Sequence, residues 1–65
     1  MDKQPDYSAM TTNERLVTAG LMDAFSVATR SRDRDAMIRL LAEVDLSQPA
    51  WIADTILKDP TRYGY

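Results

Sequence analysis

Apolar side chains recur along this chain with the three- and four-residue spacing of amphipathic helices, and no useful stretch alternates as a β-strand would. The pattern predicts helices over residues 12–30, 33–44 and 48–58. The fold class that we expect is therefore all-α: a compact three-helix domain with a loose N-terminal arm and an aromatic C-terminal tail.

The first predicted helix has both a start signal and a wide apolar stripe. Thr11 followed by Glu14 matches a capping box, in which a hydroxyl and a carboxylate satisfy free backbone N–H groups. Gly20 falls in mid-helix, where glycine costs about 1 kcal/mol relative to alanine. Because Ala24 and Ala28 continue a ridge of small residues at four-residue spacing, we interpret Gly20 as a site of close helix approach. The apolar half of the cylinder holds Leu16, Val17, Gly20, Leu21, Ala24, Phe25, Val27 and Ala28.

Capping residues delimit the other two helices. Asp33 is a favourable N-cap for the second. The third should begin with a polar cap just before Pro49, which a first turn tolerates. It should end near Lys58, because Pro60 disfavours helix at the residue before it. The centres of the apolar stripes predict the core residues Leu21, Phe25, Leu40, Leu41 and Ile56.

The third predicted helix carries more apolar surface than two neighbouring helices can cover. Trp51 lies roughly opposite the line of its smaller apolar residues. The indole must therefore be covered by one of the chain's own tyrosines, folding back from the arm or the tail, or by a partner. Since tryptophan and tyrosine are enriched at interface hot spots, the predicted partner-binding residues are Trp51, Thr55, Tyr63 and Tyr65.

A cluster of arginines surrounds the expected break between the first two helices: Arg30, Arg32 and Arg34. Guanidinium groups bind carboxylates and phosphates bidentately, so the cluster is a candidate anion-binding site. The alternative, which we favour, is a solvated junction in which Asp33 and Asp35 supply counter-charges.

The length of 65 residues allows one domain with a small core. We divide it into a flexible arm, residues 1–11, and a helical domain, residues 12–65, with Tyr7 and Met10 able to anchor the arm. The chain has no cysteine and no histidine, so neither disulfides nor the usual zinc ligands can stabilise it. Good helix packing or oligomerisation must do so.

The composition also argues against catalysis. Without histidine and cysteine, the commonest general base and the strongest nucleophile are missing. Two glycines cannot build a glycine-rich nucleotide loop. We expect a protein that is not an enzyme and that uses no cofactor and no metal. The polar N-terminus, the lack of cysteine and the lack of a long apolar run predict a soluble, cytoplasmic protein without membrane contact.

The run Leu46-Ser47-Gln48-Pro49-Ala50, with Leu41-Ala42-Glu43 upstream, resembles the turn of helix-turn-helix DNA-binding domains. The resemblance is confined to these residues and implies that the third helix contacts DNA. Three features depart from it. The turn is one residue short, Asp45 stands where glycine is usual, and the helix has no basic residue before Lys58, although base and phosphate contacts rely heavily on basic and amide side chains.

A net charge of −2 also disfavours nucleic acid as a partner. The function that we predict is protein interaction through the third helix and the aromatic tail, with another protein or a second copy of the chain as partner. The alternative is a degenerate helix-turn-helix domain that contacts DNA. We predict no specific DNA binding.

Overall fold

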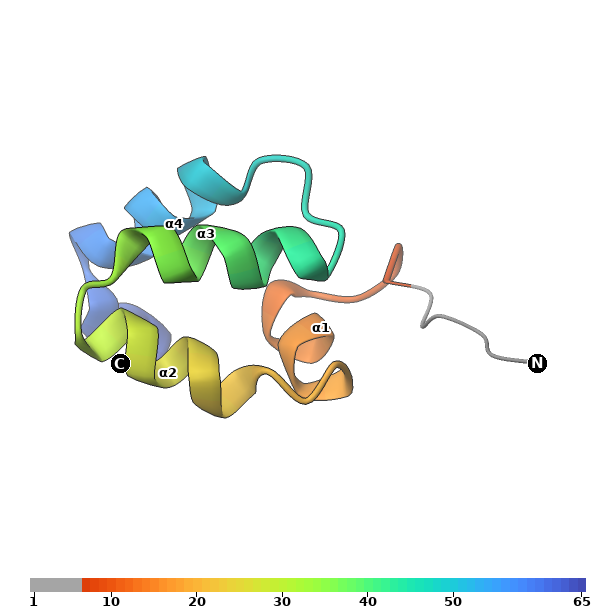
Figure 1. Ribbon diagram of the computed structural model, residues 1–65, viewed down its shortest axis with the longest axis horizontal. Coiled ribbons are helices and arrows are strands. Elements are labelled where there is room, and N and C mark those ends of the chain that lie inside the picture. The colour runs from red at the N-terminus through yellow and green to blue at the C-terminus, as the bar shows by residue number, and fades with distance from the viewer. Residues whose placement is uncertain (1–6) are drawn as a thin grey trace.

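Four α-helices and a terminal 3-10 helix make up the part of the chain that the computed structural model describes, residues 7–65. No strand occurs in these residues, so the predicted all-α class is confirmed. The predicted count of three helices is wrong, because the first predicted segment contains two. The elements are α1 (Thr12–Thr18), α2 (Met22–Arg30), α3 (Arg34–Glu43), α4 (Pro49–Lys58) and the 3-10 helix η1 (Pro60–Tyr63), as Figure 1 shows.

Gly20 separates α1 from α2. Its φ of +74° is left-handed, a conformation that favours glycine. The Gly20 N–H donates to the Val17 carbonyl at 3.0 Å, and the Leu21 N–H donates to the Leu16 carbonyl at 2.8 Å, which is the Schellman closure of a helix end. A β-carbon at Gly20 would have no neighbour within 4 Å. The interpretation of Gly20 as a site of close helix approach is therefore wrong, and the residue serves the turn.

The same closure ends α2 and α3, although neither turn contains glycine. The left-handed residue is Arg32 after α2, with φ of +57°, and Asp45 after α3, with φ of +63°. At both ends, as at Gly20, a backbone N–H donates to the carbonyl oxygen five residues earlier. Left-handed backbone is strained for residues that carry a β-carbon. Each of these two turns therefore lowers the free energy of unfolding relative to the same turn with glycine.

Replacing Asp45 by glycine is expected to raise the free energy of unfolding by roughly 0.5–1 kcal/mol, since the substitution removes this strain. The backbone bonds of the turn are kept. Gly20→Ala should have the opposite sign and cost about 1 kcal/mol. Urea unfolding followed by circular dichroism measures both changes. A loss of stability in Asp45→Gly together with no change in Gly20→Ala would contradict this explanation of the turns.

Local capping chemistry sets the helix starts. The predicted capping box is confirmed: the Glu14 N–H donates to Thr11 Oγ1 at 3.2 Å, and the Thr11 N–H donates to Glu14 Oε1 at 2.9 Å. Asp33 caps α3, as predicted, by accepting the N–H of Ala36 at 3.2 Å. The prediction of a polar side-chain cap for α4 is wrong, because α4 starts at Pro49 without such a hydrogen bond.

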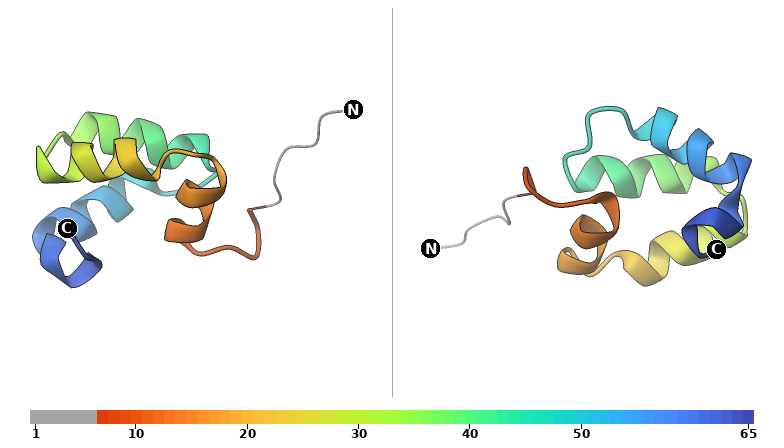
Figure 2. Two further views of the ribbon diagram at one scale, coloured as in Figure 1. Left: turned by 90° about the horizontal axis from the view of Figure 1, so that it is seen from below. Right: turned by 180° about the vertical axis from the view of Figure 1, so that it is seen from behind.

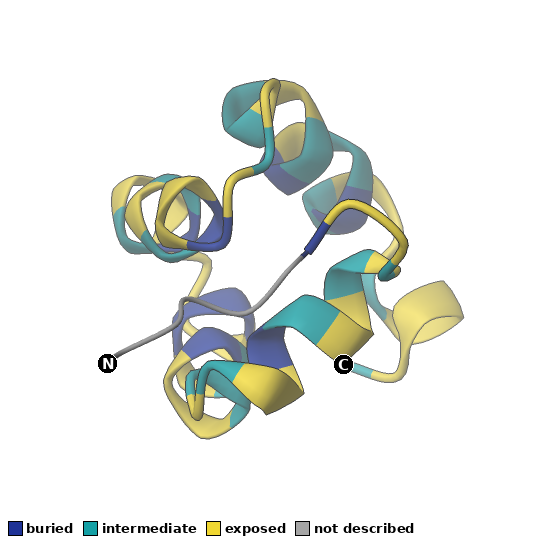
Figure 3. Ribbon diagram, turned by 90° about the vertical axis from the view of Figure 1, so that its right-hand side faces the viewer, coloured by how far each residue is buried: buried dark blue, intermediate teal, exposed yellow. Residues whose placement is uncertain are grey.

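The helices pack around one small core. α2 and α4 lie on different sides of α3 and run opposite to it, and α1 crosses the end of the bundle near the C-terminus of α3 (Figures 1 and 2). Buried positions face inward on each of the four α-helices (Figure 3). The buried apolar residues are Tyr7, Leu16, Phe25, Ala28, Met37, Leu41, Val44, Ala53 and Ile56.

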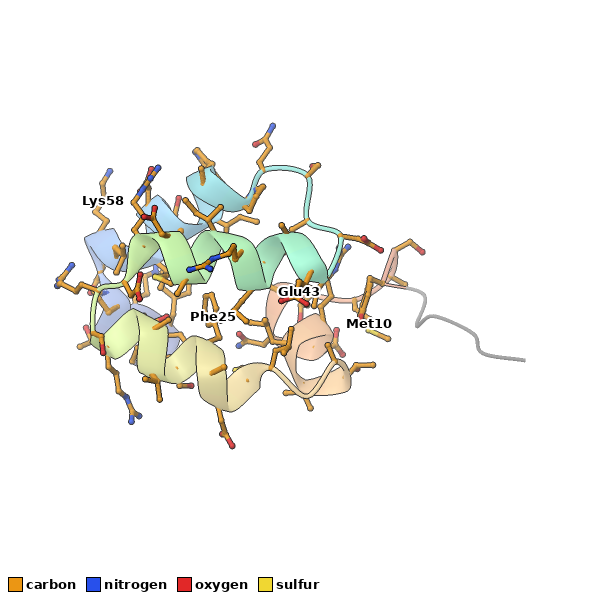
Figure 4. The ribbon with its side chains drawn as sticks, in the orientation of Figure 1. Met10, Phe25, Glu43 and Lys58 are labelled. Carbon is orange, nitrogen blue, oxygen red and sulfur yellow. The ribbon has the colours of Figure 1, made fainter. Side chains whose placement is uncertain are left out.

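Three of the five predicted core residues are buried. Phe25 and Leu41 are fully buried and Ile56 nearly so, which confirms those predictions. Figure 4 shows Phe25 projecting from α2 towards α3. Leu21 and Leu40 are only partly buried and pack against the margin of the core. The prediction that they are core residues is therefore wrong. Leu21 lies before the first turn of α2, a position that an unbroken helix would not have given it.

The side of α2 that faces the core differs from the side expected for a single helix over residues 12–30. The arc is centred on Phe25, and Val27, about 200° further round, is 64% exposed. Val17 on α1 is exposed to a similar extent. Thr29, which is not part of the predicted apolar stripe, is buried, and its hydroxyl donates to the Phe25 carbonyl at 2.8 Å. The buried hydroxyl of Thr29 therefore has its hydrogen-bond partner within its own helix.

The described part of the predicted arm, residues 7–11, packs against the helices. Tyr7 is buried and Met10 is partly buried against the core. These are the two side chains proposed as anchors. The rest of the predicted arm, residues 1–6, lies outside the described residues.

Arg15 joins the arm to the end of α3. Its Nε donates to the Met10 carbonyl at 3.1 Å, and its Nη1 donates to the carbonyls of Val44 at 3.0 Å and Asp45 at 3.2 Å. Its guanidinium carbon lies 5.9 Å from the centre of the Tyr7 ring, a cation–π distance. The positive charge also complements the negative end of the α3 dipole.

Candidate functional site

The four predicted partner-binding residues line one groove, which we call the α4–tail groove. It has a volume of about 470 Å³ and is bounded by the start of α1, one face of α4 and the C-terminal tail. Figure 2 (right) shows these three segments around the same side of the molecule. The complete lining is Thr11, Thr12, Asn13, Trp51, Ile52, Thr55, Ile56, Tyr63 and Tyr65. No sequence pattern indicated that Thr11, Thr12 and Asn13 would line this groove, because their place beside α4 depends on how α1 packs before the turn at Gly20.

Trp51 lies at the surface of this groove and is 66% exposed. Its position follows from the geometry of α4, since Ala53 and Ile56 turn the opposite side of the helix into the core. The tail does not bury the indole: Tyr63 is itself exposed, and Tyr65 packs on α2. Trp51 was predicted to be covered either by the chain's own tyrosines or by a partner. The chain's own aromatic side chains leave most of the indole in solvent.

Tyr65 holds the tail against α2. Its ring meets that of Phe25 edge-on, with centroids 5.8 Å apart and planes at 70°. Its hydroxyl donates to the Met22 sulfur at 3.7 Å. The Tyr65 N–H closes η1 on the Pro60 carbonyl at 3.0 Å, which the φ of +90° at Gly64 makes possible. One wall of the groove is thus attached to the core.

Burial raises the pKa of Tyr65 above its ordinary value of 10.0. A raised pKa in the folded state means that the neutral phenol stabilises the fold below pH ~10, and that this contribution is lost as pH rises through the folded value. We expect unfolding free energy to decline over that alkaline range more steeply in the wild type than in Tyr65→Phe. Tyr63→Phe is the matched control, which should behave as wild type. Parallel curves for wild type and Tyr65→Phe, measured by urea unfolding, would show that tail docking is not responsible.

The lining of the α4–tail groove carries no charged side chain, although 28% of the chain is charged. Besides the indole N–H of Trp51, which only donates, its polar side-chain groups are the hydroxyls of threonine and tyrosine and the amide of Asn13. Each of these hydroxyl and amide groups can both donate and accept a hydrogen bond. The groove therefore matches an uncharged surface with a few hydrogen-bonding groups.

Two of the three arginines proposed as an anion-binding site contact α4. Arg34 forms a bidentate pair with Asp54, with Nε–Oδ1 at 2.6 Å and Nη2–Oδ2 at 3.2 Å. The hydrogen bond from Arg34 holds the pKa of Asp54 below its ordinary value of 3.8. Arg32 donates to the Leu57 carbonyl at 3.2 Å, and Arg30 is exposed. The carboxylate that pairs with Arg34 is thus Asp54 on α4, not Asp33 or Asp35 as the junction interpretation expected, and the anion-binding role of the cluster stays a prediction.

A second hollow lies between α2 and α3. It is lined by Ala24, Val27, Ala28, Ser31, Asp33, Ala36, Arg39, Leu40 and Glu43. Unlike the α4–tail groove it carries charges of both signs. Among residues 7–65, no group of three or more acidic side chains is placed to hold a metal ion. No helix in the same range is long and apolar enough to cross a membrane.

Comparison of this chain with protein-family models, with curated proteins and with solved structures gives no match.

Proposed function

We propose that this chain is a small, non-enzymatic protein-interaction domain that binds its partner through the α4–tail groove. The observation that carries the proposal is the exposed indole of Trp51 beside an uncharged groove that also includes Thr55, Tyr63 and Tyr65. Tryptophan and tyrosine contribute most to binding where a partner excludes water from them.

The walls of the groove are held in place by contacts outside it. Arg34 and Asp54 tie α4 to the start of α3, and Tyr65 rests on Phe25. A groove that is already ordered loses less conformational entropy when a partner binds. More of the free energy gained by burying the indole therefore contributes to affinity.

DNA binding by a degenerate helix-turn-helix domain receives less support. Asp45 does adopt the left-handed conformation, at the position where that family usually has glycine. The same turn also ends α1 and α2, however, so it is not specific to DNA-binding domains. The exposed face of α4 presents Trp51 and Asp54, whose carboxylate is paired with Arg34, and the helix has no basic residue before Lys58 with which to contact phosphates.

The test is capture of cross-linked partners by the intact chain, with the partner being either another protein or another copy. Trp51→Ala should weaken association roughly 30-fold or more, the effect of losing a hot-spot residue. Val27→Ala is the matched control, because Val27 is equally exposed but lies on α2 outside the groove. Equal association of the two variants would contradict the proposal. So would salt-sensitive binding to duplex DNA at low salt that Trp51→Ala abolishes.

A further inference from the structure

We draw no further inference here: the strongest candidate, the uncharged groove between the start of α1, one face of α4 and the C-terminal tail, is an unpartnered surface beside Trp51, and nothing in the structure shows what covers it.

Discussion

Replacing Leu41 by alanine is expected to lower the free energy of unfolding by roughly 2–5 kcal/mol. Leu41 has no exposed surface and lies in the core where α3 meets the other helices. Cores in chains of this size rarely supply more than ~3–5 kcal/mol. The variant should therefore be largely unfolded at room temperature, with a loss of helical signal by circular dichroism.

Leu40→Ala is the matched control for this result. It makes the same substitution in the same helix, so the change in helix propensity is common to both. Leu40 is only partly buried, beside the hollow between α2 and α3. We expect it to cost less than Leu41→Ala, about 1 kcal/mol. If the two variants melt together, the assignment of the core face of α3 is wrong.

Loss of the Arg15 guanidinium should have the second largest effect on stability, about 1–3 kcal/mol. This group donates to three carbonyl oxygens, on Met10, Val44 and Asp45, and it stacks with Tyr7. In Arg15→Ala these carbonyls lose their partner while the arm loses its link to α3. Hydrogen exchange should then show faster exchange at the end of α3 and in residues 7–11.

Arg15→Lys separates charge from geometry. Lysine keeps the favourable charge near the end of α3, but its compact ammonium cannot reproduce the fork that reaches the arm and α3 together. We expect an intermediate loss of stability. Arg30→Ala, which removes an exposed arginine, should be close to neutral. A loss in Arg30→Ala as large as that in Arg15→Ala would mean that total charge, not this contact, stabilises the fold.

The features that could be predicted from the sequence depend on residues close together along the chain. The all-α class, the capping box at Thr11, the cap at Asp33 and the end of α4 before Pro60 are decided within one or two helical turns. The position of Trp51 away from the core also followed from helical periodicity, because Ala53 and Ile56 left only one side of α4 for burial.

Tertiary structure decided what local pattern could not. A glycine such as Gly20 is compatible with a helix interior and with a helix end, and the apolar stripe continues across it. The end prevails because α1 packs across the bundle, where Leu16 is buried and Arg15 reaches α3. Periodicity predicts which side of a helix is buried, but not the direction of the chain after a left-handed turn. That direction brings residues 11–13 beside α4 and the tail, where they complete the α4–tail groove next to Trp51. The sequence indicated only that two neighbouring helices would leave the Trp51 indole uncovered.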